Sequence, residues 1–135
     1  MTSATAARLT APILSGGAAV AGAAYVHAVD PGVAGHYPGC PFLMLTGWYC
    51  PGCGSLRALH ALTSGDVSTA LARNPLTVLV VALVVAGWVG WLGRAYAGRP
   101  LTVNPSPRLL WAGLGLVAAF WVLRNVPGWT WLSPA

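Results

Sequence analysis

The sequence contains no lysine and no glutamate, and its only acidic residues are Asp30 and Asp66. Charged residues make up 7% of the 135 residues, whereas they make up about 25% of an ordinary soluble domain. A soluble protein of this length needs a charged surface, and seven arginines with two aspartates do not provide one. The scarcity of carboxylates also leaves any general acid–base role to histidine or cysteine.

Apolar residues take the place of the missing charge. They make up 56% of the chain, and the mean hydropathy is +0.68. The length suits one domain, and the composition predicts that this domain lies in a lipid bilayer. The arginines are scattered at the ends of apolar runs and form no basic stripe, so the net charge of +5 does not indicate nucleic-acid binding. The expected partners are the bilayer and another membrane protein.

Three apolar runs are candidates for transmembrane helices: residues 9–29, 75–93 and 108–124. A helix rises about 1.5 Å per residue, so roughly 20 residues cross the ~30 Å hydrocarbon core. The third run is shorter than this. We expect Arg108 and Arg124 at its ends to extend it by pointing outward toward the headgroups.

The first run has a second interpretation. Arg8, the apolar stretch and the small residues Ala21, Gly22 and Ala23 also fit a secretory signal peptide with a cleavage site. Because the run is long enough to span, a transmembrane helix is the leading interpretation.

The segment between the first two runs, residues 36–74, contains all three cysteines. Within it, residues 42–49 are apolar but too short to cross a bilayer, and they suit a re-entrant or interfacial position. Residues 54–62 are expected to form a short helix. Together these features predict a Cys-rich re-entrant or interfacial helical hairpin.

Two capping signals follow. Asp66 is expected to cap a short helix over residues 67–73, and Asn74 with Pro75 is expected to begin the second long helix. The predicted fold class is therefore an all-α membrane protein, with three transmembrane helices and the hairpin between the first and the second. Residues 1–135 then form a single integral membrane domain.

The distribution of arginine predicts the orientation. One side of the membrane would carry Arg8, Arg94, Arg99 and Arg108, and the other would carry Arg57, Arg73 and Arg124. The positive-inside rule then places the N-terminus in the cytoplasm and the Cys-rich segment outside a bacterial cytoplasmic membrane. Trp129 and Trp131 near the C-terminus suit an interfacial tail.

The three cysteines are the main candidates for a functional site. Cys40, Cys50 and Cys53 have the spacing C-x9-C-x2-C. If a helix begins at Cys53, Arg57 and His60 lie at i+4 and i+7, on the same face as that cysteine. These five residues are the candidate cluster.

Three interpretations of the cluster remain open. A structural disulfide could join Cys50 to Cys53, or Cys40 to either of them if the apolar hairpin folds back, but it leaves one cysteine unpaired. A zinc site, with zinc as the candidate cofactor, would use a Cys3His ligand set: Cys40, Cys50, Cys53 and His60. Thiol redox chemistry would use Cys50 and Cys53, with a thiolate favoured by the helix N-terminus and by Arg57.

Residues from about Asp30 to Leu83 also resemble a known family. The pattern is Tyr37-Pro38-x-Cys40-Pro41, then Cys50-Pro51-Gly52-Cys53-Gly54-x-x-Arg57, then His60, Gly65-Asp66 and Asn74-Pro75. It resembles the uncharacterised bacterial membrane family described as domain of unknown function 2752. The resemblance implies a membrane location and marks the five cluster residues as positions of interest. It implies no activity.

The leading functional hypothesis is non-enzymatic. The chain would be a small integral membrane protein with a structural Cys/His cluster, closed by a disulfide or by zinc, that forms a lipid- or partner-facing module. No residue is catalytic under this hypothesis. The alternative is a membrane thiol–disulfide oxidoreductase that uses Cys50 and Cys53.

Overall fold

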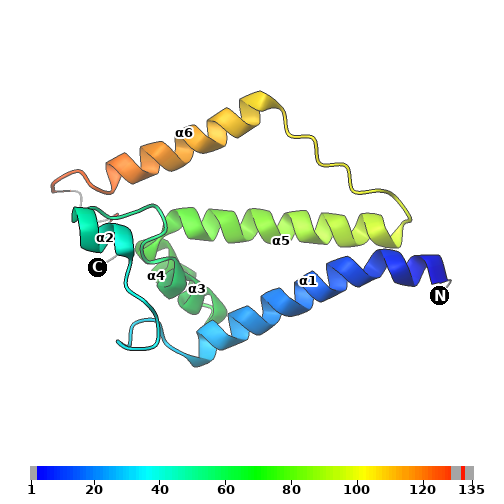
Figure 1. Cartoon of the computed structure of the whole chain (residues 1–135), viewed down its shortest axis with the longest axis horizontal. Coiled ribbons are helices and arrows are strands. Elements are labelled where there is room, and N and C mark those ends of the chain that lie inside the picture. The colour runs from blue at the N-terminus through cyan, green and yellow to red at the C-terminus, as the bar shows by residue number, and fades with distance from the viewer. Residues whose placement is uncertain (1–2, 129–131, 133–135) are drawn as a thin grey trace.

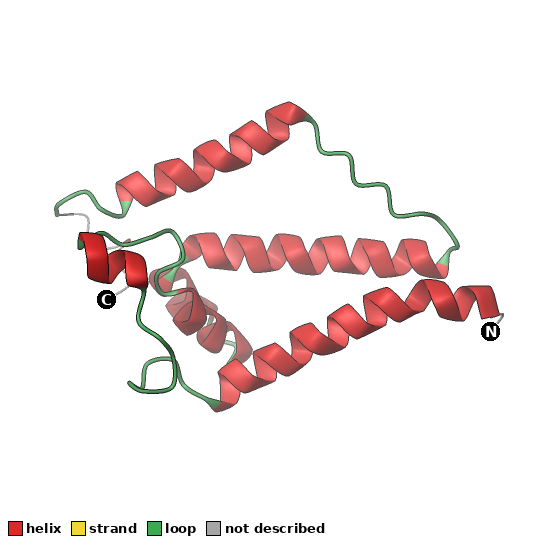
Figure 2. Ribbon diagram, in the orientation of Figure 1, coloured by secondary structure: helices red, strands yellow, loops and turns green. Residues whose placement is uncertain are grey.

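The computed structural model of the chain describes residues 3–128 and 132, and the regular structure of these residues is entirely helical (Figure 1, Figure 2). The helices of this part are α1 (Ser3–Ala28), α2 (Pro41–Thr46), α3 (Ser55–Thr63), α4 (Val67–Arg73), α5 (Pro75–Tyr96) and α6 (Pro107–Leu123). The predicted all-α fold is confirmed. Trp129 and Trp131 lie outside the described residues.

The two longest helices, α1 and α5, lie side by side and run in opposite directions (Figure 1). The indole Nε1 of Trp88 on α5 donates a hydrogen bond to the carbonyl of Pro12 on α1, at 2.9 Å. The same indole ring lies against Gly16, where an added Cβ would clash with it. Trp88 therefore holds the two helices together and requires glycine at the opposing position.

Two helices are long and apolar enough to cross a membrane, over Ala6–Ala28 and Pro75–Tyr96. They coincide with the runs predicted at residues 9–29 and 75–93. The third run forms α6, a shorter apolar helix of 17 residues. A third membrane crossing therefore stays a prediction.

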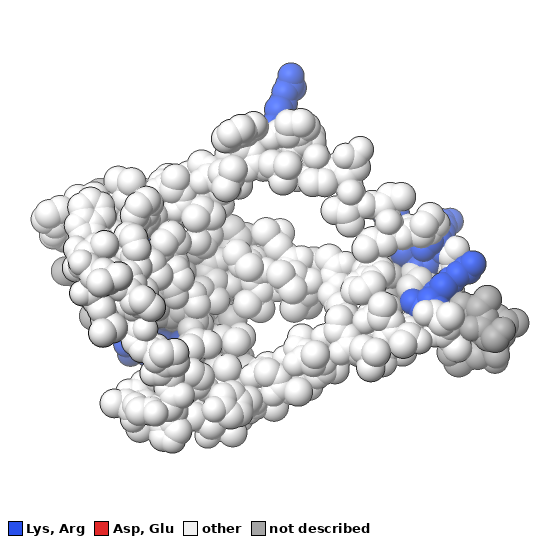
Figure 3. All heavy atoms as spheres, viewed as in Figure 1, with Lys and Arg blue, Asp and Glu red and all other residues white. Residues whose placement is uncertain are grey.

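Large apolar side chains cover the outside of the long helices. Leu83 and Val84 on α5 are each 63% exposed, and Trp111 on α6 is 73% exposed. No residue of α6 is buried. Figure 3 shows a mostly uncharged surface, with positive charge near the ends of the helices. An apolar surface of this extent suits lipid contact better than water.

The short helices α3 and α4 pack together at one end of the α1–α5 pair (Figure 1). Ala58 and Ala61 of α3 meet Ala70 of α4, and Leu62 and Val78 pack against this cluster. Small side chains allow the two helices to approach closely. The re-entrant or interfacial depth of the segment stays a prediction.

Both predicted caps are present. The Asp66 carboxylate accepts a hydrogen bond from the N–H of Thr69 at 2.9 Å, and α4 begins and ends as predicted. Hydrogen bonds from Thr69 and then Ser68 lower the pKa of Asp66 to about 2. The Asn74 side chain accepts from the N–H of Thr77 at 3.0 Å and so caps α5. Local sequence chemistry therefore determines where these two helices begin.

The contact between Gly16 and Trp88 gives a prediction. Gly16→Val should destabilise the α1–α5 pair by about 1–3 kcal/mol, because the added side chain overpacks against the indole ring. Gly17→Val is a matched control, since a Cβ at Gly17 meets no atom within 4 Å. Unfolding in mixed detergent micelles measures both variants. Equal stability of the two variants would contradict this account of the helix contact.

Candidate functional site

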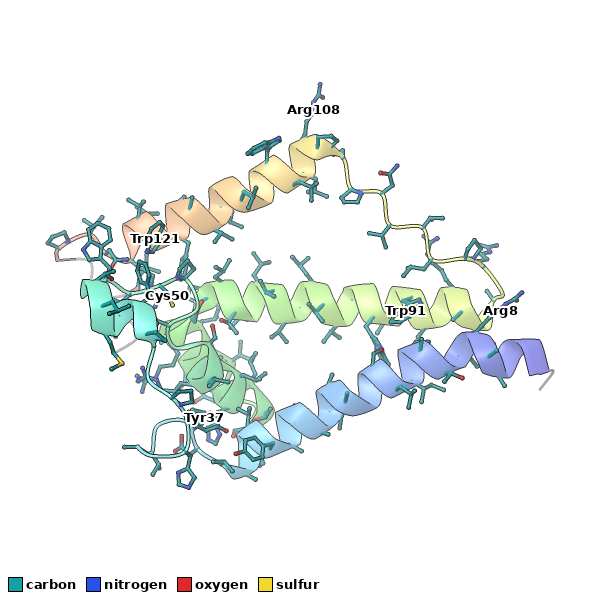
Figure 4. The ribbon with its side chains drawn as sticks, in the orientation of Figure 1. Arg8, Tyr37, Cys50, Trp91, Arg108 and Trp121 are labelled. Atoms are coloured by element: carbon teal, nitrogen blue, oxygen red, sulfur yellow. The ribbon has the colours of Figure 1, made fainter. Side chains whose placement is uncertain are left out.

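The three cysteine side chains meet at one point. The Sγ atom of Cys50 lies 3.2 Å from that of Cys53 and 3.5 Å from that of Cys40. All three Sγ atoms lie within 4.8 Å of one another. Cys53 is buried and the other two are half-buried. Figure 4 labels Cys50 at the end of the molecule where the short helices gather.

The local backbone explains this approach. Cys40 immediately precedes Pro41, the first residue of α2, and Gly47 ends that helix in the left-handed conformation with a φ of 71°. Cys50 and Cys53 share a tight turn, in which the N–H of Cys53 donates to the carbonyl of Cys50 at 3.1 Å. The N–H of Cys50 donates to the Sγ of Cys53 at 3.3 Å, which favours negative charge on that sulfur.

A buried arginine from the other end of the chain holds the Cys50–Cys53 turn. Arg124 follows α6 directly and is 2% exposed. Its Nη1 donates to the carbonyls of Cys50 at 2.8 Å and Pro51 at 3.2 Å. Its Nη2 donates to the carbonyl of Cys53 at 3.1 Å. The prediction that Arg124 points outward is wrong, because the side chain turns back to satisfy buried carbonyls.

Two asparagines hold the same region. The Nδ2 of Asn74, which is fully buried, donates to the carbonyls of Pro51 at 2.9 Å and Cys53 at 3.1 Å. The side-chain amide of Asn125 pairs with the backbone of Tyr49, accepting from its N–H at 2.8 Å and donating to its carbonyl at 2.9 Å. Side chains from two places in the sequence, residue 74 and residues 124–125, therefore fix the backbone around the cysteines.

Arg124 and Asn125 were not predicted from the sequence as site residues. Asn74 was predicted as a helix cap but not as a partner of the cysteine turn. The contacts of Arg124 and Asn125 join residues 71 to 76 positions apart, a separation that no local pattern reports. The available signal was a polar Arg-Asn pair directly after an apolar helix in a chain with few polar groups.

The electrostatic environment makes the three thiols unequal. Burial raises the pKa of Cys53 to about 12 and outweighs the effect of its backbone hydrogen bond. A hydrogen bond from the backbone of Leu43 lowers the pKa of Cys40. Burial also lowers the pKa of Arg124, while the neighbouring Cys53 acts in the opposite direction. The Cys40 thiol therefore ionises more readily than the buried Cys53 thiol.

An open cavity of about 390 Å³ adjoins the sulfurs and is lined by all three cysteines. Arg57 and Tyr37 also line it. Arg57 is half-buried, and the Tyr37 hydroxyl donates to the carbonyl of Val29 at 3.0 Å. Figure 4 shows Tyr37 near the loop that follows α1. A small ligand or a side chain of another molecule would fit beside the thiols.

The structure does not bring His60 into this group. Its Nδ1 lies 2.9 Å from the carbonyl of Val26 on α1, and its ring stacks on His27 with 6.0 Å between centroids. The prediction that Arg57 and His60 share a helix face with Cys53 assumed a helix that begins at Cys53. Instead, Gly54 adopts a φ of 82° and α3 begins at Ser55, two residues after Cys53. The predicted Cys3His set is therefore corrected to three cysteines, while Arg57 does share their cavity.

A structural disulfide is not supported. All three cysteines are free, and the shortest separation of sulfurs, 3.2 Å, exceeds the ~2.05 Å of a disulfide bond. In a tetrahedral zinc–thiolate site with Zn–S bonds of about 2.3 Å, sulfurs lie about 3.8 Å apart. The separations of 3.2 and 3.5 Å are slightly shorter than that value, and the third lies within 4.8 Å. The three cysteines are therefore placed to hold a metal ion such as zinc.

The family model described as "Protein of unknown function (DUF2752)" matches residues 40–88. The matched segment contains the three cysteines, Arg57 and Asn74, but not Arg124. The match confirms the resemblance drawn from the sequence. No curated protein and no solved structure matches the chain significantly.

The Arg124 contacts give a second prediction. Arg124→Met should open the Cys50–Cys53 turn and expose Cys53 to alkylation in the presence of a chelator. We expect the rate to rise about tenfold or more, because hydrogen bonds from a charged donor contribute about 1.5–3 kcal/mol each and 1.4 kcal/mol is a factor of ten. Peptide mapping by mass spectrometry after timed alkylation measures the rate at each cysteine.

Arg108→Met is the matched control for this experiment. Arg108 is exposed at the opposite end of α6 (Figure 4). This variant removes the same charge without touching the cysteine turn, so protection of Cys53 should equal that of the wild type. Full protection of Cys53 in Arg124→Met would show that the arginine does not hold the turn.

Proposed function

We propose that this protein is a small integral membrane protein with a structural zinc site. Its residues 40–88 match the family of unknown function. The ligands are the thiolates of Cys40, Cys50 and Cys53. The observation that carries the proposal is the approach of all three sulfurs to within 4.8 Å of one another. The ion would join the residue before α2 to the turn before α3, and so make one rigid module of this end of the molecule.

Charge balance supports a cation at this place. Three thiolates around Zn²⁺ carry one net negative charge, and the buried guanidinium of Arg124 supplies one positive charge nearby. The hydrogen bonds of Arg124 go to carbonyl oxygens of the turn and leave the sulfurs available to a metal. Arg124 would thus neutralise the loaded site without competing for its ligands.

The described residues supply three ligands, whereas a structural zinc site has four. The cavity beside the sulfurs has room for a fourth ligand, and Arg57 lines the same cavity. We infer that a water molecule, or a side chain of a partner membrane protein, completes the site. A partner that supplies this ligand would make the module an interaction surface.

The membrane arrangement is part of the proposal. α1 and α5 cross the bilayer and α6 is the third, shorter crossing, with the N-terminus in the cytoplasm and the cysteine module outside. The antiparallel α1–α5 pair, which gathers the cysteine-bearing segments at one end, supports two crossings with the module on one side of the bilayer (Figure 1). The distribution of arginine supports the orientation. Bound zinc would also protect the thiols from oxidation in an oxidising compartment.

A thiol–disulfide oxidoreductase is the competing function. The 3.2 Å between the sulfurs of Cys50 and Cys53 favours it as well, because a small movement would allow a bond between them. In that reaction the dithiol would pass two electrons and two protons to a disulfide substrate. Removal of one cysteine would then trap a mixed disulfide with the other.

The test is metal analysis of protein purified in detergent without chelator. We expect one zinc ion per chain in the wild type. Cys40→Ser, Cys50→Ser and Cys53→Ser should each lower the zinc content more than about tenfold, because each removes one of three thiolate ligands. His60→Ala is the matched control and should retain full zinc, since His60 faces α1.

Two outcomes would contradict the zinc site. One is metal-free wild-type protein whose Cys50→Ser or Cys53→Ser variant accumulates a mixed disulfide, which would establish the oxidoreductase. The other is equal loss of zinc in His60→Ala, which would restore the Cys3His set. Circular dichroism of each variant separates loss of the ligand from loss of the fold.

A further inference from the structure

We propose that the end of the molecule opposite the cysteines binds an anionic phospholipid. The site combines an apolar groove with an adjoining pocket lined by two arginines. The groove has a volume of about 630 Å³ and the pocket about 300 Å³, and both are lined by Trp91 and Leu101. The proposal depends on the membrane location proposed above, but not on the zinc site.

The apolar groove lies between α1 and α5. Its walls include Ala19 from α1 and Val84 and Trp88 from α5, and Leu101 from the connector after α5 also lines it. The Nε1 of Trp88 is already bonded to the carbonyl of Pro12, so the indole offers the groove its apolar face. An acyl chain is the ligand that matches such a surface.

The arginine pocket lies at the N-terminal end of α1. The Nη1 of Arg8 donates to the carbonyl of Gly98, just after α5, at 3.4 Å. This contact directs the guanidinium of Arg8 from α1 toward the turn that carries Arg99, and both arginines line the pocket. Figure 4 shows Arg8 and Trp91 at the same end of the molecule. The two cationic groups therefore lie next to the apolar groove.

Neither of the two aspartates, both of which the structure describes, lies beside these arginines. Asp30 follows the opposite end of α1 and accepts from the N–H of Gly32 at 2.7 Å, while Asp66 is engaged in capping α4. The 26 residues of α1 separate the two ends by about 39 Å at 1.5 Å per residue. Figure 3 shows positive charge but no acidic side chain at the Arg8 end of the face drawn. Among the described residues, neither aspartate is therefore placed to pair with these arginines, which leaves them available to an anion from outside the chain.

A phospholipid meets both requirements in one molecule. Guanidinium groups bind phosphate oxygens with paired, charge-assisted hydrogen bonds. The arginine pocket lies at a helix end, where the lipid headgroups of a spanned bilayer are, and the groove continues along the helices toward the bilayer interior. A phosphate on the arginines with an acyl chain in the groove would occupy both cavities.

Native mass spectrometry of the detergent-purified full chain tests this site by titration with phosphatidylglycerol. Phosphatidylcholine with the same acyl chains is titrated in parallel. We expect Arg8→Gln/Arg99→Gln to bind phosphatidylglycerol about 30-fold more weakly, because each arginine near anionic lipid contributes about 1 kcal/mol and 1.4 kcal/mol is a factor of ten. Arg8→Lys/Arg99→Lys should restore most of the binding.

Matched variants separate the two halves of the site. Arg94→Gln/Arg108→Gln removes two exposed arginines that do not line the pocket, and it should bind phosphatidylglycerol like the wild type. Ala19→Phe fills the groove and should weaken binding. Ala112→Phe adds the same side chain to an exposed position of α6 and should not weaken it.

Three results would overturn the proposal. Equal retention of phosphatidylcholine and phosphatidylglycerol would mean an apolar groove without charge recognition. Equal weakening in Arg94→Gln/Arg108→Gln would mean general attraction to anionic lipid. Displacement of the lipid by millimolar inorganic phosphate, with Ala19→Phe unchanged, would mean a free-anion site. Circular dichroism confirms that each variant is folded before it is compared.

Discussion

The buried guanidinium of Arg124 is the interaction on which the cysteine site depends. Carbonyl groups in a tight turn beside an apolar environment need hydrogen-bond donors, and a guanidinium supplies five in a fixed plane. The Nη1 and Nη2 groups of Arg124 donate three hydrogen bonds to the turn that contains Cys50 and Cys53, while its buried Nε has no partner among the described residues. Because Arg124 directly follows α6, the same contacts attach the C-terminal end of that otherwise exposed helix to the cysteines. The last helix and the cysteine turn therefore form one unit.

Polar groups in this chain are few, and the structure concentrates them at the helix ends. The Cys-rich end uses asparagine, arginine and backbone groups to order a loop. At the opposite end, Arg8 and Arg99 line a pocket to which the described part of the chain contributes no acidic side chain. The long helices between these ends expose apolar side chains, and they meet through a glycine and a tryptophan rather than through a large apolar core. This division suits a protein whose long helices are surrounded by lipid, with an ordered cysteine site at one end and an arginine pocket at the other.

The sequence predicted the features that depend on local chemistry. Asp66 and Asn74 cap the helices they were expected to cap, and the three cysteines gather as their spacing suggested. Prediction from the sequence was wrong where a single backbone angle or a distant contact decides where a side chain lies. Gly54 interrupts the turn before α3 and so directs His60 toward α1, and Arg124 reaches a turn 71 positions earlier in the chain. Neither effect leaves a periodic pattern in the residues.

The coordination of the bound ion tests the central claim most directly. X-ray absorption at the zinc edge of the purified protein should show three sulfur neighbours at about 2.3 Å and one lighter atom at about 2.0–2.1 Å. That pattern should persist in His60→Ala, because the imidazole is engaged with the carbonyl of Val26. Zinc bound by nitrogen and oxygen alone, with no sulfur neighbours, would contradict the account.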